Sequence, residues 1–159
     1  MALARPDAEG LLVDIGSTTT DLIAFRRGRV QVGARRDVDR LASGELVYQG
    51  VVRTPLCALG PRIGWRGMAH NVMNEFFATT ADVYRVTGEL DAAHDQQPAA
   101  DGGAKTLAGS QARLARMIGL DARDGSGDDW AAFARAWRQA QGAQLRGQAR
   151  ELAARLLLL

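Results

Sequence analysis

The fold of this chain is decided by the stretch Asp14-Ile15-Gly16-Ser17-Thr18-Thr19-Thr20-Asp21. Apolar runs flank it at residues 11–13 and 22–25, a pattern that predicts two strands joined by a turn. Gly16 allows a tight turn and lets a ligand approach the backbone without meeting a Cβ atom. Consecutive N–H groups in such a turn form an anion-binding nest. The stretch therefore predicts a hairpin that binds phosphate.

The side chains of this loop extend the predicted site. Ser17, Thr18 and Thr19 supply neutral hydroxyl donors, and together with Gly16 they are the predicted phosphate-binding residues. Asp14 ends its strand, where a carboxylate is placed to hold Mg²⁺ or a metal-bound water, or to act as a base. The alternative is a plain hairpin whose hydroxyl groups satisfy its own backbone.

At these residues the chain resembles the actin, Hsp70 and sugar-kinase ATPase superfamily, whose phosphate loops have the form Asp-x-Gly-(Gly/Ser)-Thr-x-Thr-Asp on a β-hairpin. Within that superfamily the pattern is similar to the hydantoinase/oxoprolinase branch. Successive landmarks of one subgroup are matched at residues 44–55, 74–84, 100–102 and 113–117. That subgroup comprises hydantoinase-A-like proteins of tetrahydromethanopterin-linked one-carbon metabolism, whose archaeal members resemble a methanofuran-biosynthesis synthase.

The resemblance implies an α/β fold of the ribonuclease-H-like (actin-like ATPase) type, with N-terminal β-hairpins in a meander followed by helices. Proteins of this kind carry two phosphate hairpins in a longer chain, and the Ser-Thr-Thr-Thr form resembles the second. We therefore expect the C-terminal half of a family member. Residues 1–10 are expected to be a tail and residues 11–159 a single actin-like domain, helical from about residue 110.

The resemblance also implies an activity. The expected enzyme is a synthase that transfers an aminomethylfuran group from its diphosphate to a phenol-like acceptor, or an ATP-dependent hydantoinase-like enzyme. Its expected ligands are Mg²⁺ and either ATP or another small phosphorylated substrate. The alternative is a non-catalytic half that docks through apolar helices onto a separate N-terminal half, or onto itself. Trp130, Phe133 and Trp137 share one helix face and are the residues expected there, unless the chain buries them in its own core.

Further candidate residues lie downstream of the loop. Arg53 and Glu75 complete the predicted catalytic set. Arg53 suits a phosphate or carboxylate, or a surface ion pair, and Glu75 points from an apolar run either into a site or into solvent. Asp82 closes a capping-box pattern and fits a helix cap better than a catalytic acid. Asp101, followed by two glycines, either meets a ribose or metal or forms a turn.

Composition excludes several classes of protein. The hydrophobic content of 47% and charged content of 24% are ordinary for a globular protein. The formal net charge is only +2, with arginines scattered among 18 acidic residues, which argues against nucleic-acid binding. Cys57 is the only cysteine, so no internal disulfide can form. Neither a signal peptide nor a membrane-spanning run is evident, and we expect a cytoplasmic location.

The remaining pattern predicts a coarse order of elements. A turn at residues 26–29 leads to a third strand at 30–32, followed by a helix at 37–46, a strand at 47–52 and a loop at 61–67. Helices are predicted from residue 79 to about 86, from 110 to 118, and from about 128 onward. Gly142 is a weak point in the last of them.

Overall fold

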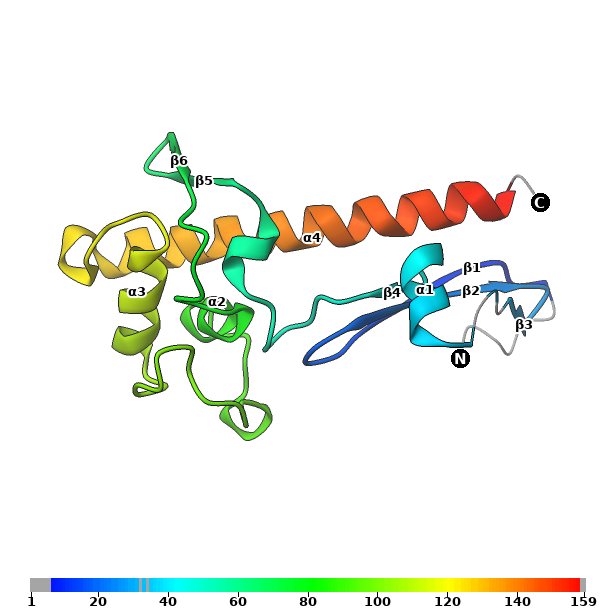
Figure 1. Cartoon of the computed structure of the whole chain (residues 1–159), viewed down its shortest axis with the longest axis horizontal. Helices are drawn as coiled ribbons and strands as arrows, with labels where there is room; N and C mark the ends of the chain where they lie inside the picture. Colours follow the sequence, from blue (N-terminus) through cyan, green and yellow to red (C-terminus); the bar gives the residue numbers. More distant parts are fainter. Residues whose placement is uncertain (1–6, 32, 34, 158–159) are drawn as a thin grey trace. The chain divides into compact units, whose positions relative to one another are not determined.

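The computed structural model describes residues 7–31, 33 and 35–157, and the contacts divide the chain into two compact units. We call residues 1–50 with 143–159 the hairpin unit and residues 51–142 the core unit. The described residues form four α-helices and six strands, and every strand pair is antiparallel (Figure 1). This mixture of strands and helices confirms the predicted α/β class in its coarse form. The assignment of residues 11–159 to one domain stays a prediction.

The hairpin unit is built on a small sheet. Its strands are β1 (Gly10–Ile15), β2 (Thr20–Arg26), β3 (Arg29–Val30) and β4 (Leu46–Val47). β1 pairs with β2 in the register Gly10↔Phe25 to Ile15↔Thr20, and β3 and β4 pair with two ends of β2. Arg27 and Gly28 join β2 to β3 with φ angles of 50° and 68°, the positive values that a two-residue hairpin turn requires. Both turns are therefore where the sequence predicts them.

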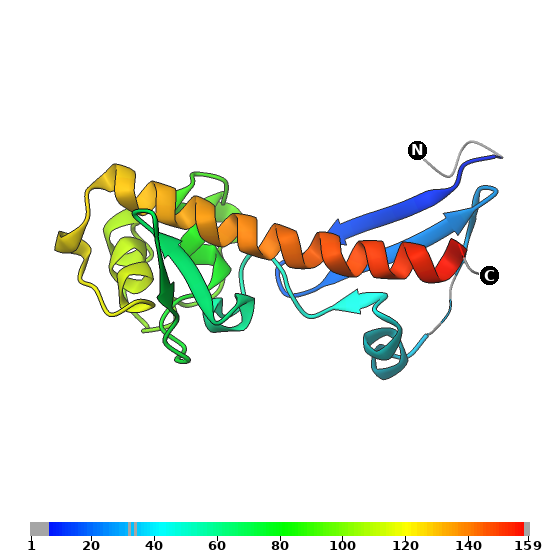
Figure 2. The same cartoon turned by 90° about the horizontal axis from the view of Figure 1, so that it is seen from above.

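One face of the sheet is buried. Thr20, Leu22 and Ala24 alternate along β2 and are each at most 5% exposed, which is the period of a strand with one covered face. The second half of α4 (Gly127–Leu157) lies over the sheet and buries Leu145 and Leu152 (Figures 1 and 2). The core of this unit is therefore small.

The segment after the sheet departs from the predicted order. The helix predicted at 37–46 is α1 (Asp37–Ser43), which ends at Gly44 because this residue adopts a φ of 75°. The strand predicted at 47–52 is wrong beyond β4, since the chain leaves the sheet after Val47 and turns at residues 51–53. The predicted end of the third strand, Val32, lies outside the described residues.

The core unit holds the main hydrophobic cluster. Its elements are the 3₁₀ helix η2 (Leu56–Leu59), strands β5 (Arg62–Trp65) and β6 (Met68–Asn71), α2 (Thr80–Val86), the 3₁₀ helix η3 (Ala92–His94), α3 (Leu107–Arg116), the 3₁₀ helix η4 (Ala122–Asp124) and the first half of α4. The loop predicted at 61–67 is wrong, because this segment forms the β5–β6 hairpin. Helix α3 begins earlier than predicted, since the Thr106 side chain caps it by accepting from the Gly109 N–H at 3.1 Å.

Aromatic side chains form the centre of this cluster. Trp65 stacks on Trp130 with ring centroids 4.4 Å apart, and Phe133 meets Trp65 edge to face at 5.2 Å. A Cβ atom on Gly125 would lie 2.8 Å from both indole rings, so the glycine lets the loop before α4 close over them. Trp130, Phe133 and Trp137 are each 1% exposed. These residues therefore belong to the core of their own unit and form no exposed docking face.

Helix α4 is the helix predicted from about residue 128 onward. It runs through the weak point at Gly142 without a break, from Gly127 to Leu157. No helix in the described part of the chain is both long enough and apolar enough to cross a membrane.

Candidate functional site

The predicted phosphate loop is the turn between β1 and β2. The Gly16 N–H closes the turn by donating to the Thr19 carbonyl at 2.8 Å. Within the described residues the N–H groups of Ser17, Thr18 and Thr19 have no protein acceptor, so they are the donors that a ligand can reach. Thr20 turns inward and donates its hydroxyl to the Gln49 carbonyl at 2.7 Å. The loop therefore offers three backbone donors beside the hydroxyl groups of Ser17, Thr18 and Thr19.

Gly50 supports this loop from behind. A Cβ atom at Gly50 would lie 2.5 Å from the Gly16 carbonyl oxygen and from backbone atoms of Ser17 and Thr18. A Cβ atom on Gly16 itself would meet only the Thr19 carbonyl oxygen, at 3.3 Å. Gly50 is thus the position where absence of a side chain matters most to the loop. Sequence reasoning missed it, although it lies in the landmark at residues 44–55.

Two aspartates flank the loop at the strand ends. Asp14 and Asp21 are directly opposite in the β1–β2 register, so their side chains share one face of the hairpin. Asp21 is held in an ion pair with Arg40 of α1. The Asp14 carboxylate is exposed and has no hydrogen bond or ion pair with another described residue.

The surroundings of Asp14 can be compared with the ligands that Mg²⁺ requires. The described part of the chain contains no group of three His, Cys, Asp or Glu side chains that could hold a metal ion. Mg²⁺ is usually held by one or two carboxylates together with waters and substrate phosphates. One exposed carboxylate beside the predicted phosphate loop fits that donor set, so Asp14 is the residue that would hold the ion.

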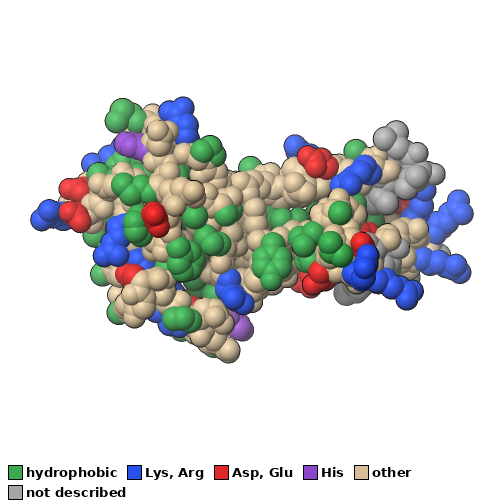
Figure 3. All heavy atoms as spheres, in the orientation of Figure 1, with side chains coloured by type: hydrophobic (Ala, Val, Ile, Leu, Met, Phe, Trp, Pro, Cys, Tyr) green, Lys and Arg blue, Asp and Glu red, His purple; other side chains and the backbone are tan. Residues whose placement is uncertain are grey.

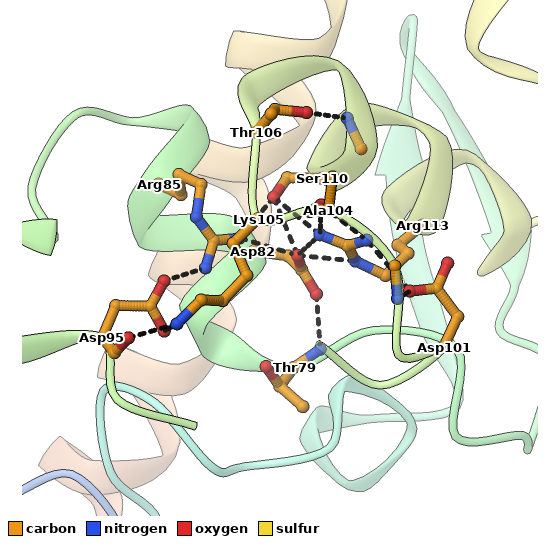
Figure 4. Close-up of polar contacts among 12 residues, drawn as sticks. Thr79, Asp82, Arg85, Asp95, Asp101, Ala104, Lys105, Thr106, Ser110 and Arg113 are labelled. Carbon is orange, nitrogen blue, oxygen red and sulfur yellow. Dashed lines mark hydrogen bonds and ion pairs between the residues drawn. The ribbon is translucent and has the colours of Figure 1, made fainter. Parts of the chain in front are cut away.

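In the core unit, Asp82 is the centre of a buried ionic network (Figure 4). Its Oδ1 accepts from Arg85 Nη1 at 3.0 Å, from Ser110 Oγ at 2.8 Å and from Arg113 Nε at 2.9 Å. Its Oδ2 accepts from the Thr79 N–H at 3.1 Å and so forms the predicted capping box at the start of α2. Every oxygen of this buried carboxylate is satisfied, so its position supports the helix-cap alternative to a catalytic acid.

Arg113 joins Asp82 to Asp101. The Arg113 side chain is 1% exposed and also donates to Asp101 Oδ1 at 3.0 Å. Burial by itself lowers the pKa of Arg113. The hydrogen bonds and negative charges of Asp82 and Asp101 raise the pKa by more, so the net shift is upward. For Asp101, burial by itself raises the pKa of the carboxyl group. The hydrogen bond from the Gly103 N–H and the positive charge of Arg113 outweigh this effect, so the net shift of the pKa is downward. Asp101 thus forms the turn that the sequence offered as one alternative.

Asp95 extends the network on the other side of Arg85. Arg85 Nη2 donates to Asp95 Oδ2, and the Lys105 ammonium lies 3.7 Å from Asp95 Oδ1, beyond hydrogen-bond distance. Asp95 is 7% exposed, and its Oδ1 is buried without a hydrogen-bond partner among the described residues. One acceptor of a buried carboxylate is therefore left open.

A cleft of about 330 Å³ opens beside this network. Its lining includes Arg53, Phe76, Asp82 and Asp95. Arg53 is exposed and makes no hydrogen bond or ion pair with another described residue. Glu75 is exposed, does not line the cleft, and likewise makes no side-chain hydrogen bond or ion pair within the described residues.

The structure thus distributes the predicted residues over both units. Asp14 and the loop of residues 16–19 lie in the hairpin unit, and Arg53, Glu75, Asp82 and Asp101 lie in the core unit. Arg53 and Asp82 share the cleft, whereas Glu75 and Asp101 do not line it.

Comparison with known proteins points to one family. The family model described as hydantoinase/oxoprolinase matches residues 1–134. Two curated relatives both carry the name (4-{4-[2-(gamma-L-glutamylamino)ethyl]phenoxymethyl}furan-2-yl)methanamine synthase. The relative from Methanocaldococcus jannaschii is 36% identical over 111 residues, which are 70% of this chain and 33% of the relative. The relative from Methanococcus vannielii is 32% identical over 123 residues, or 77% and 55%. The chain thus spans about a third and about half of the lengths of these relatives.

Proposed function

Because the chain belongs to the hydantoinase/oxoprolinase family, we propose that it is the phosphate-binding part of a synthase in methanofuran biosynthesis. The observation that carries the proposal is the β1–β2 loop, in which the N–H groups of Ser17, Thr18 and Thr19 have no acceptor among the described residues. We further propose that the hairpin unit corresponds to the ribonuclease-H-like half of an actin-like ATPase. The antiparallel order β1–β2–β3, with the loop in its first turn, supports this assignment.

The names of the two relatives suggest the bond that is made. They describe a furan that carries a methanamine and is joined through a methylene carbon to a phenoxy oxygen. In the proposed reaction a phenol oxygen attacks that methylene carbon, the bond from carbon to the diphosphate oxygen breaks, and its electron pair leaves on the diphosphate. The phenol proton passes to a base.

The loop has a specific task in this reaction. Negative charge develops on the departing diphosphate, and preorganised N–H donors stabilise such charge most where water is excluded. The three open N–H groups of the loop supply donors of this kind, and Asp14 would hold Mg²⁺ beside them. Bound Mg²⁺ would neutralise part of the diphosphate charge.

Calorimetric titration with inorganic diphosphate tests the loop directly. Wild type should bind diphosphate, and Gly16→Val should abolish binding, because a Cβ atom there lies only 3.3 Å from the Thr19 carbonyl oxygen and the branched side chain crowds the loop further. Asp14→Asn should weaken only the part of the affinity that depends on Mg²⁺, since it removes an anionic ligand at nearly constant size. Gly64→Val is the matched control, because a Cβ atom there meets nothing within 4 Å. Equal binding by wild type and Gly16→Val would refute the proposed site.

A second candidate function is assembly with another protein half, and an observation on β1 favours it. Leu12, Val13 and Ile15 are 50%, 42% and 45% exposed on a strand that pairs only with β2 within the described residues. Figure 3 shows hydrophobic side chains at the surface of the hairpin unit. An open strand edge with apolar side chains on both faces is a template for another strand.

Two measurements separate this candidate from a self-sufficient enzyme. The chain alone should self-associate in light scattering, and a compact monomer at high concentration would reject assembly. It should also release little diphosphate alone, whereas adding the N-terminal half of a family member in trans should restore turnover that depends on Asp14. Robust turnover by the isolated chain, lost in Asp14→Asn, would show instead that the chain is a complete enzyme.

A further inference from the structure

The cleft of the core unit has the features of a built binding site. Its volume of about 330 Å³ is at the lower end of the roughly 300–1,000 Å³ of small-molecule sites. Apolar walls are supplied by Val52, Phe76 and Pro98. Phe76 is 54% exposed, so part of its ring is accessible to a ligand in the cleft. This size and lining suit a molecule with one flat apolar body.

Two polar groups of the cleft have no hydrogen-bond partner in the described part of the chain. Arg53 offers a guanidinium without an ion pair, and Asp95 offers Oδ1 without a hydrogen bond. The Arg53 fork matches a carboxylate or a phosphate group. A buried acceptor such as Asp95 Oδ1 costs free energy until a donor reaches it.

The charges beside the cleft decide what that donor is. Four cations, Arg85, Lys105, Arg113 and Arg116, are paired with three carboxylates, those of Asp82, Asp95 and Asp101. These seven charges leave the network with one positive charge, and Arg53 adds another, so the surroundings of the cleft carry a surplus of positive charge. A ligand with a negative charge and a neutral donor reduces this surplus, whereas an added ammonium would increase it.

We propose that this cleft binds a small organic anion that carries one carboxylate or phosphate group, a flat apolar body and, at the opposite end, a hydroxyl or other neutral N–H or O–H donor. Arg53 binds the anionic group, Phe76 covers the body, and Asp95 accepts from the donor. The proposal is independent of the phosphate loop, since it concerns residues of the core unit only.

The probe 4-(hydroxymethyl)benzoate carries all three features and contains no phosphate. Calorimetric titration of the 159-residue chain should show binding. Arg53→Gln should weaken it about 10- to 100-fold, the factor for loss of a hydrogen bond to a charged group. Arg135→Gln is the matched control, because Arg135 is an exposed arginine of the same unit that does not line the cleft. Equal affinities of wild type and Arg53→Gln, or no binding by wild type, would overturn the proposal.

Changing the probe tests the donor without disturbing the ionic network. Replacing the hydroxyl group by hydrogen, in 4-methylbenzoate, should weaken binding, and benzyl alcohol, which lacks the anion, should bind most weakly. Amide resonances of Asp95 and Gln97 should shift on titration with the hydroxyl probe in NMR spectra, and less with 4-methylbenzoate. Equal affinity for the two benzoates would reject the role of Asp95. Shifts confined to residues 16–19 would place the anion in the phosphate loop and refute the site.

Discussion

Replacing Gly50 by alanine should damage the phosphate loop from outside it. The new Cβ atom would lie 2.5 Å from three backbone atoms of residues 16–18, which is 0.9 Å short of the 3.4 Å at which ordinary contact begins. Backbone atoms cannot rotate aside as a side chain end can, so the loop or the chain at Gly50 must move by nearly that distance. Overpacking of this kind costs typically about 1–3 kcal/mol. A lost hydrogen bond to a charged group costs about 1.5–3 kcal/mol, which is roughly 10- to 100-fold in affinity.

The two effects are measured separately. Thermal unfolding followed by circular dichroism should show a Tm lowered by roughly 2–12 °C, since 1 kcal/mol corresponds to about 2–4 °C for a chain of this size. Diphosphate titration should show affinity lowered by roughly 10- to 100-fold, because the displaced loop no longer presents all its N–H donors to the anion. Gly147→Ala is the matched control in the same unit: its Cβ atom meets nothing within 4 Å, so it should leave the affinity unchanged and should not lower the Tm. A Gly50→Ala variant with the Tm and the affinity of wild type would show that the loop does not depend on this close approach.

Three further predictions concern stability. Asp82→Asn should lower the free energy of unfolding, measured by urea denaturation, by about 3–5 kcal/mol, because it breaks a buried ion pair with Arg113. A change below about 1 kcal/mol would contradict a central role for the network. Gly147→Ala should raise the free energy of unfolding by up to about 1 kcal/mol, since alanine is the better helix former and the position in α4 is uncrowded. A lowered Tm would argue against a continuous helix at this residue. A hydrogen bond from Arg66 holds the pKa of Asp129 well below its usual value, so this carboxylate contributes stability above about pH 4, and the contribution is lost as the pH falls further. When Tm is measured against pH, it should therefore fall less steeply below about pH 4 in Asp129→Asn than in wild type. Equal slopes of Tm against pH in the two proteins below about pH 4 would refute a stabilising role for ionised Asp129.

Local chemistry explains how far the fold could be predicted. The sequence predicts a turn at Arg27-Gly28 because strand-like runs flank it, and the structure has a hairpin there. Arg66-Gly67 adopts nearly the same positive φ angles, 45° and 78°, in the β5–β6 turn, yet its strands were missed. The glycines and the proline at residues 60–67 obscure the alternation of buried Ile63 and Trp65 with exposed neighbours. The pair Arg66-Gly67 repeats the Arg-Gly sequence of the first hairpin turn and was the feature of the sequence that could have indicated a second hairpin.

In the candidate site, contacts between residues close in sequence could be predicted, whereas contacts between distant residues could not. The capping box at Thr79 and Asp82 spans three residues, so its pattern is visible in the sequence. The hydrogen bond from Arg113 to Asp82 joins residues 31 apart, and the contact of Gly50 with the loop crosses a similar distance. No periodicity encodes such contacts, because tertiary packing alone brings the residues together. Whether the loop binds phosphate stays a prediction.

The distribution of tryptophan has a practical consequence for spectroscopy. Trp65, Trp130 and Trp137 all lie in the core unit, and the three indoles are almost entirely shielded from solvent. Intrinsic fluorescence excited at the tryptophan band will therefore report on the melting of residues 51–142 and remain silent about the sheet that carries the phosphate loop. Far-ultraviolet dichroism senses the backbone of both units. Coincident transitions from the two probes would identify a single cooperative domain, and separated transitions would reveal two.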